Sequence, residues 1–362
     1  MINYIKNWWW SIDRWVFILT LTLISIGILL ILSSSSGIEL RYNFANNYLI
    51  KKHLLFLPIA IFIIFFFSTL SIRNLIIMSL IIFTFCLILS FIVLFLPNET
   101  KGAKRWLKLY QFTVQPSEFI KPAYVIISAL LLSRFKKKND MSFNINLILL
   151  SLISLALISQ PDFGMFVLIF ITWFSQIILL GVSIKIMLFL ITFGGLVTFF
   201  SYISHSHVRF RINNFFDKSL GDNYQTNLSL DALSSGGFFG KGIGTGTFSK
   251  KLPDAHSDFI FSIASEELGF VFSCLIIFIY LIIFYRVTIN TLKIDNLFIF
   301  LATSGLSLIF IFQILINISS AMNLIPTKGM TLPFLSYGGS SLLSCSIIIG
   351  SILSLTKKRT GF

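Results

Sequence analysis

Residues 75–96 read LIIMSLIIFTFCLILSFIVLFL and contain no charged side chain. A helix needs about 20 predominantly apolar residues to cross the hydrocarbon core of a bilayer, so this run predicts a membrane-spanning helix. The composition excludes a soluble globular protein, because hydrophobic residues make up 56% of the chain and charged residues only 12%, against roughly 25% charged in soluble domains. Outer-membrane barrels alternate polar and apolar residues and lack such long runs. The sequence therefore predicts an all-α polytopic membrane protein.

Further apolar runs lie on either side of this one, and no soluble domain or repeat interrupts them. We predict a single integral membrane domain over residues 1–362, with ten spanning helices at about residues 15–32, 54–70, 75–96, 117–133, 145–159, 163–181, 184–203, 259–285, 297–323 and 334–355. A long connection, residues 204–258, separates the seventh helix from the eighth. An even number of spans puts both termini on one side. The short loops on that side carry more Lys and Arg than those opposite, which favours cytoplasmic termini and an extracytoplasmic long loop.

The net charge of +14 divides unevenly over this topology. The predicted inside segments carry 13 basic and 3 acidic residues, for a net charge of +10, which the positive-inside rule explains. The outside loops carry 14 basic and 7 acidic residues, for a net charge of +7, and the membrane segments carry a net charge of −3. Topology does not require the outer excess, so it indicates an anionic ligand at the outer face.

The first polar stretch, residues 101–121, precedes and enters the fourth predicted span. Its basic, aromatic and polar residues are Lys101, Lys104, Arg105, Trp106, Gln115, Glu118 and Lys121. Trp and Lys are common at any membrane interface, and Glu118 and Lys121 have the spacing of a helical ion pair that neutralises itself. Alternatively, the basic cluster is an anion clamp, because a guanidinium binds phosphate with two parallel hydrogen bonds. The residues leave both interpretations open.

The second polar stretch, residues 252–269, closes the long loop and opens the eighth span. Asp258 stands where a helix N-cap belongs, a role worth about 1 kcal/mol. Small or polar residues also recur at helical spacing on one face, as in the wall of a cavity: Asp258, Ser262, Ser265 and Gly269. Two adjacent acids inside the span, Glu266 and Glu267, are costly there and favour a functional role for this face over simple capping.

The third polar stretch, residues 317–341, contains Lys328 between two prolines and is rich in small and polar residues, among them Ser336 and Ser340. Gln313, Asn317 and Ser320, at the start of the stretch and just before it, follow helical i, i+4, i+7 spacing. A solvated outer-loop lysine and a ligand-facing lysine are equally compatible with this pattern. Two other signals are weaker. The glycines of residues 240–246 lack the strand–turn–helix context of a phosphate-binding loop and predict a flexible loop, and the His205, His207 and His256 set lacks a zinc-site pattern.

Together these stretches resemble the SEDS family of bacterial membrane proteins (shape, elongation, division and sporulation). The resemblance extends over essentially the whole chain and is carried by KGAKRW at 101–106, QPSE at 115–118, QPDFG at 160–164, LPDAHSDFIF at 252–261, EELG at 266–269 and PTKGMTLPFLSYGGSS at 326–341. The PTKG segment is similar to the division branch, FtsW, where the elongation branch, RodA, usually has Pro-Val-Thr-Gly. Ser257 and Asp254 depart conservatively from the usual Thr and Glu.

The resemblance implies a SEDS-type fold and polymerisation of lipid II into glycan strands outside the cytoplasmic membrane, at the division septum. The essential Asp of the family falls on Asp258, as a general base or as the ligand of a divalent cation, Mg or Mn. Lys101, Lys104, Arg105 and Lys328 are candidates for holding the pyrophosphate. The other expected substrate-binding residues are Trp106, Gln115, Glu118, Lys121, Gln160, Asp162, His256, Glu266, Ser336 and Ser340.

The same resemblance implies a set of partners: the growing glycan strand, a class B penicillin-binding protein that cross-links it, other divisome proteins and membrane lipid, but no nucleic acid. Two other functions fit a polar ten-helix protein. A lipid II flippase predicts charged sites on both faces of the membrane, whereas the polar stretches here gather at the outer ends. A non-catalytic divisome scaffold predicts that Asp258 is dispensable.

Overall fold

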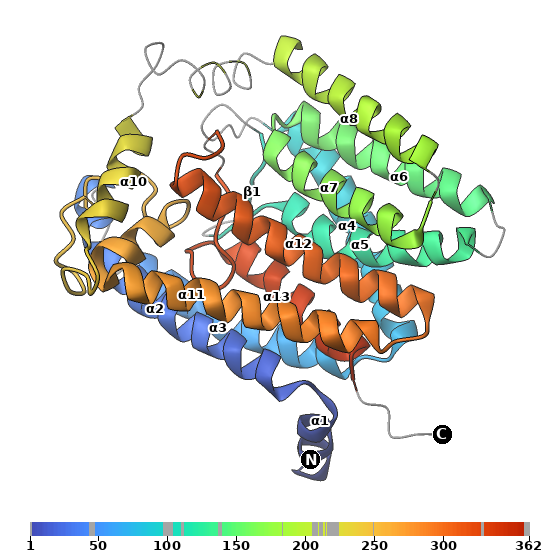
Figure 1. Ribbon diagram of the computed structural model, residues 1–362, viewed down its shortest axis with the longest axis horizontal. Helices are drawn as coiled ribbons and strands as arrows, with labels where there is room; N and C mark the ends of the chain where they lie inside the picture. Colours follow the sequence, from blue (N-terminus) through green and yellow to red (C-terminus); the bar gives the residue numbers. More distant parts are fainter. Residues whose placement is uncertain are drawn as a thin grey trace.

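The computed structural model describes residues 2–42, 48–96, 104–109, 112–136, 140–182, 184–204, 209, 213, 215, 224–248, 250–326 and 329–357. Within these residues, one long helix corresponds to each of the ten predicted spans, and the helices run roughly side by side (Figure 1). They are α2 (Arg14–Tyr42), α3 (Tyr48–Thr69), α4 (Ile72–Phe95), α5 (Pro116–Phe135), α6 (Asp140–Ser159), α7 (Phe163–Leu180), α8 (Ile184–Ser204), α11 (Ile260–Leu292), α12 (Leu297–Ala321) and α13 (Gly339–Leu355). Judged by length and composition alone, seven of them could cross a membrane, and α13 is a shorter apolar helix.

The structure also contains elements that the hydropathy pattern did not predict. A short helix, α1 (Ile2–Ser11), precedes the first span, and Trp8 fixes it by donating from Nε1 to Ser68 Oγ at 2.7 Å. Helix α10 (Tyr224–Ser235) lies within the long loop. A two-stranded antiparallel hairpin, β1 (Leu107–Leu109) with β2 (Phe112–Val114), precedes α5.

Helices α5, α12 and α13 form the centre of the bundle. The side chains of α5 are buried along nearly the whole helix, which is why this span tolerates Glu118 and Lys121. Peripheral helices instead turn large apolar residues outward, such as Phe62 on α3 and Phe85 on α4. A protein in water would bury these side chains, so the outward apolar surface is the one expected to face lipid.

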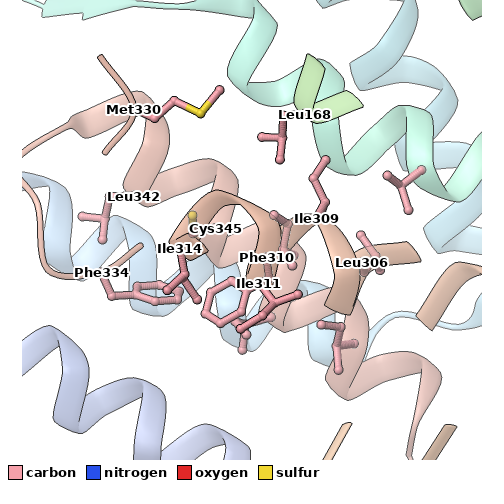
Figure 2. Close-up of a cluster of buried hydrophobic side chains, with 14 of the residues drawn as sticks. Leu168, Leu306, Ile309, Phe310, Ile311, Ile314, Met330, Phe334, Leu342 and Cys345 are labelled. Atoms are coloured by element: carbon pink, nitrogen blue, oxygen red, sulfur yellow. The ribbon is translucent and has the colours of Figure 1, made fainter. Parts of the chain in front are cut away.

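Apolar side chains also seal the centre beneath the loop that joins α12 to α13. Figure 2 shows side chains of α7, α12, α13 and this loop in one buried cluster, including Leu168, Leu306, Ile309, Phe310, Ile311, Ile314, Met330, Phe334, Leu342 and Cys345. The loop is thus part of the core, because Met330 and Phe334 anchor it there. The packing of Met330 and Phe334 against the helices fixes the position of the loop backbone.

The two ends of the bundle differ. Helix α1 and the C-terminal end of α13 lie near one end, whereas α10, the β1–β2 region and the loop between α12 and α13 lie toward the other (Figure 1). We call the second end the loop end. The three polar stretches predicted from the sequence all meet there, at the ends of α5, α11, α12 and α13.

Helix α11 is interrupted at Gly269, whose φ of 84° is outside the helical region. A Cβ atom there would lie 2.3 Å from the backbone N of Gly240, so only glycine allows the glycine-rich segment to approach. That segment donates from Lys241 N to Glu266 O at 3.0 Å and from Gly242 N to Glu267 O at 2.9 Å. The sequence predicted a flexible loop, but the segment is fixed to the kink of α11 by these bonds.

Candidate functional site

Asp258 lies at the loop end, just before α11 begins. The N-cap position of α11 is Phe259, one residue after Asp258, and Phe259 makes no side-chain cap bond. The backbone N of Asp258 donates to Asp254 O at 3.0 Å and so closes the turn that precedes the helix. The Asp258 side chain is half-buried. Its Oδ2 atom lies 3.1 Å from where a Cβ on Gly329 would be, so the chain following Lys328 passes directly beside the carboxylate.

The backbone of the Asp258 turn is held by donors from distant parts of the sequence. His256 O accepts from Tyr337 N at 2.8 Å, Ser257 O from Ser336 Oγ at 2.6 Å, and Asp258 O from Asn317 Nδ2 at 3.0 Å. Three successive carbonyl oxygens are thus bonded to α12 and the loop after it. This fixes the direction in which the Asp258 side chain leaves the backbone.

Tyr337 contributes packing as well as a backbone bond. Its ring lies 5.3 Å from the His256 ring and 6.1 Å from the His53 ring of α3, measured between centroids. Burial raises the pKa of Tyr337 to about 12, so the phenol remains protonated near neutral pH. The predicted site residue His256 is therefore held between the α12–α13 loop and the turn that it belongs to.

Two amides one helical turn apart on α12 hold the α12–α13 loop. Asn317 Nδ2 donates to Met330 O at 2.6 Å in addition to Asp258 O. Gln313 Nε2 donates to Thr331 O at 2.9 Å and to Ser341 Oγ at 3.3 Å. Both amides are almost completely buried, where a missing hydrogen bond is costly. Asn317 therefore ties the catalytic candidate and the neighbouring loop to the same helix.

A buried ion pair lies below this point. Lys121, only 1% exposed, contacts Glu118 with 2.6 Å between Nζ and Oε2, and it also donates to Gln313 Oε1 at 2.8 Å. The helical pairing predicted from the i, i+3 spacing is confirmed. Because Gln313 also bonds Thr331, the ammonium of Lys121 reaches the loop through a single amide.

A second cluster forms where β2 leads into α5. The backbone N of Gln115 donates to Ser340 Oγ at 3.0 Å, and its side-chain Nε2 donates to Asp162 Oδ2 at 3.0 Å. Arg105, with 24% of its side chain exposed, lies 3.5 Å from Asp162 Oδ1 through Nη1 and donates from Nε to Gln160 O at 3.3 Å. Its guanidinium thus also holds the turn between α6 and α7.

The small and polar face of α11 has a different partner from the one expected. Ser262 Oγ lies 2.7 Å from Ser229 Oγ of α10, and Ser265 Oγ donates to Leu233 O at 3.1 Å. The face was predicted to line a cavity, but it is the surface on which α10 packs. The prediction missed this because α10 is too polar to be recognised from hydropathy, while small residues are what a close helix contact requires.

Glu266, predicted to bind substrate, is fully buried and bonded to the glycine-rich segment. Its Oε1 accepts from Thr247 N at 2.7 Å and Phe248 N at 3.0 Å, and it lies 3.3 Å from Lys241 Nζ. Its observed contacts anchor the loop, so a role toward substrate stays a prediction.

The predicted site residues thus fall into separate groups. Asp258, His256 and Ser336 meet at the turn, and Lys121 and Glu118 lie beneath it. Arg105, Gln115, Gln160, Asp162 and Ser340 form the second cluster, with Lys104 and Trp106 half-buried next to Arg105 in the chain. Lys101 and Lys328 lie outside the described residues. Asn317 and Gln313 were absent from the predicted site although their i, i+4 spacing marked one polar face of a span.

The donors around Asp258 do not form a protein-only metal site. Among the residues that the structure describes, no group of three or more His, Cys, Asp or Glu side chains is placed to hold a metal ion. Mg²⁺ is also commonly bound by one or two carboxylates together with phosphate oxygens of a substrate. The described residues offer only the first of these contributions, through Asp258.

Comparisons with known proteins identify the family of the chain. A family model described as "Cell cycle protein" (FtsW/RodA/SpoVE) matches residues 13–361. The chain is 34% identical to the probable peptidoglycan glycosyltransferase FtsW of Caulobacter vibrioides, over 98% of this chain and 91% of that one. It is 31% identical to the protein of the same name from Coxiella burnetii, over 96% of each.

Solved structures share the fold at lower sequence identity. A chain from "Structural coordination of polymerization and crosslinking by a peptidoglycan synthase complex" superposes with a TM-score of 0.79 at 22% identity, over 96% of this chain and 98% of that one. Rod shape determining protein RodA of Thermus thermophilus gives a TM-score of 0.69 at 22% identity, over 96% and 97%. With the family match over nearly the whole chain, these likenesses mean that the chain belongs to the FtsW/RodA/SpoVE family, the SEDS proteins.

Proposed function

We propose that this protein is a peptidoglycan glycosyltransferase that polymerises lipid II into glycan strands during cell division. Relatives of comparable length carry that activity in their names, marked as probable. The single observation that supports it most is the fixation of Asp258. Three backbone bonds and the passing chain at Gly329 hold one half-buried carboxylate at the loop end. Pre-oriented acid–base groups of this kind are what glycosyl transfer needs.

In the proposed reaction, the 4-hydroxyl oxygen of an N-acetylglucosamine attacks C1 of an N-acetylmuramic acid. The C1–O bond to the polyprenyl pyrophosphate breaks, and its electron pair leaves with the pyrophosphate. Asp258 accepts the proton of the attacking hydroxyl. A carboxylate with a fixed direction can do this when the hydroxyl lies within hydrogen-bonding distance, so the backbone bonds to Asn317 and Ser336 serve the chemistry by limiting where the carboxylate can lie.

The developing charge on the pyrophosphate needs cations. Lys104 and Arg105 approach the loop end from the β1–β2 side, and Lys101 and Lys328 are further candidates outside the described residues. Arg suits this role because its planar guanidinium can hold two phosphate oxygens at once. Arg105 already binds the Gln160–Asp162 turn, so we assign it a shared role in which it shapes the site and attracts the anion.

A divalent cation, Mg²⁺ or Mn²⁺, is a further proposal that rests on Asp258 as its single protein ligand. Such an ion would supply charge neutralisation at the pyrophosphate when bound. None of the steps above depends on it, because Asp258 has a role as a base without it.

The proposed setting is the bacterial cytoplasmic membrane at the septum, with both termini in the cytoplasm and the loop end outside. The proposed partners are a class B penicillin-binding protein and other divisome proteins, along with the lipid II and glycan strand on which the enzyme acts. A cross-linking partner is supported by the fold, which also occurs in a peptidoglycan synthase complex.

The test is polymerisation of labelled lipid II by the purified protein with its transpeptidase partner, in proteoliposomes that receive lipid II on one known face. We expect Asp258→Ala to abolish polymerisation while the protein folds normally. Full polymerisation by Asp258→Ala would remove Asp258 from the mechanism. Transfer of lipid II across the bilayer without polymer would support a flippase instead, and neither activity in the wild-type protein would support a scaffold.

A further inference from the structure

The glycine-rich segment, taken here with its flanking residues as 236–248, carries two adjacent exposed aromatic residues that have no part in the proposed reaction. Phe238 and Phe239 are 71% and 85% exposed, and Ile243 in the same segment is also exposed. Exposed apolar patches of this kind usually mark a contact with a membrane or another molecule. The question is which of these covers the pair.

The backbone of the segment is held in place by hydrogen bonds to α11. Gly237 O accepts from Phe270 N at 2.9 Å, and Phe238 O accepts from Val271 N at 3.2 Å. Buried Glu266 binds the backbone at Thr247 and Phe248. The segment therefore occupies a fixed height along α11.

That height can be worked out from α11 itself. Arg286, whose side chain is 39% exposed, pairs with Asp13 near the terminal end. Because a charge inside the hydrocarbon is costly, we take this pair as one boundary of the hydrocarbon region. Phe270 lies roughly 16 residues before Arg286, which is about 24 Å at 1.5 Å per residue. The hydrocarbon core is about 30 Å thick, so the opposite boundary falls about 6 Å beyond Phe270 toward the loop end, close to the kink at Gly269. The segment bonded to Phe270 consequently lies at the membrane boundary.

The exposed pair is also continuous with the surface that faces lipid. Phe238 packs edge-on against Phe270, with ring centroids 6.4 Å apart. Phe270 is 59% exposed, and further exposed apolar residues follow it down α11, among them Phe278. Nearby, Lys241, whose side chain is 32% exposed, directs its ammonium to Glu266. Aromatic residues at this level are typical of membrane-interface belts.

We propose that residues 237–243 form a lipid-inserting segment, in which Phe238 and Phe239 enter the bilayer at the loop end and are covered by acyl chains. This fixes the height of the α11 kink in the membrane, and with it the height of Asp258 eight residues before Glu266. It does not depend on the reaction that the protein catalyses.

The test uses a nitroxide label on Cys introduced by Phe239→Cys in a Cys274→Ala background, with the full chain in proteoliposomes. Cys86 and Cys345 are buried, so the background protein should take up little label. Native Cys274, exposed on α11, is the matched lipid-facing reference, and Ser234→Cys on exposed α10 is the water-facing reference. The readout is the collision rate of each label with oxygen and with a water-soluble nickel chelate.

We expect a ratio of oxygen to nickel collisions at Phe239→Cys that exceeds the ratio at Ser234→Cys severalfold and stays below the ratio at Cys274, because Cys274 lies deeper along α11. Phe238→Cys provides a second position and should behave alike. A ratio equal to that of Ser234→Cys would overturn the proposal by placing the segment in water. Shielding from both reagents would also overturn it, because protein rather than lipid would then cover the pair.

Discussion

Substitution of Asn317 separates the positioning of Asp258 from the stability of the bundle. Asn317→Ala removes one buried Nδ2 group, which donates to Asp258 O at 3.0 Å and to Met330 O at 2.6 Å. Leaving a buried carbonyl unsatisfied costs roughly 1–3 kcal/mol, so the two together predict a loss of about 2–6 kcal/mol in stability. The loss is local to the turn and the loop that meet at Asp258.

The catalytic consequence follows from geometry. Without Asn317 the Asp258 turn keeps the bonds from Ser336 and Tyr337, but its last carbonyl is released from α12. Misplacement of a reacting group by about 1 Å can cost on the order of 10²-fold in rate. We therefore expect Asn317→Ala to lower kcat for lipid II polymerisation by about that factor while KM changes little, because the candidate anion-binding residues Lys104 and Arg105 are untouched.

The chain offers a matched control in Asn146. It is fully buried on α6, accepts from Tyr124 Oη at 2.8 Å and donates to Ser128 Oγ at 3.1 Å. Asn146→Ala should lower the unfolding temperature to a similar degree yet keep kcat near the wild-type value. Both variants are assayed well below their unfolding temperatures. Equal losses of kcat in the two variants, or a wild-type kcat for Asn317→Ala, would refute the positioning argument.

Two further predictions concern the cations and the loop anchor. Arg105→Ala should raise KM for lipid II by about tenfold, because a hydrogen bond to a charged group contributes roughly 1.5–3 kcal/mol. Arg105→Lys should recover part of the affinity. An unchanged KM in steady-state assays of both Arg105→Ala and Lys328→Ala would exclude the pyrophosphate clamp. Glu266→Gln should loosen the glycine-rich segment, because the hydrogen bonds from Lys241 and the loop backbone to this side chain would no longer have a charged acceptor. Trypsin should then cut after Lys241 faster than in the wild-type protein. An unchanged cleavage rate would contradict the anchoring role of Glu266.

Hydropathy was enough to predict the spanning helices, because each is a long apolar run whose length the bilayer dictates. It misjudged boundaries where polar residues are satisfied inside the protein. The first span was predicted to end at residue 32, before four serines, yet α2 continues to Tyr42. Ser33 is buried and donates to Glu267 of α11, a contact between residues far apart in sequence. A buried serine with such a partner does not end a helix.

The site was predictable only in part for a similar reason. Asp258 could be singled out because it follows a long loop and opens a span, and the resemblance to SEDS proteins indicated the same residue. Its fixation could not be predicted, because Asn317 and Ser336 are far from it in the sequence and reach it only through the fold. Helix α10 was missed because its polar sequence forms a stable helix only where Ser262 and Ser265 provide a surface for it.

The structure also narrows the meaning of the outer charge excess. Two of the basic residues assigned to the outer loops, Arg105 and Lys241, contact the acids Asp162 and Glu266, which were assigned to the membrane segments. Lys121 pairs with Glu118 within the membrane segments. Much of the predicted −3 of those segments is therefore balanced by outer bases, and the outer charge left for a ligand falls from +7 toward +5. Because Arg105 divides its guanidinium between a structural turn and any anion, we expect the clamp to depend also on lysines, so Lys104→Ala should raise KM for lipid II.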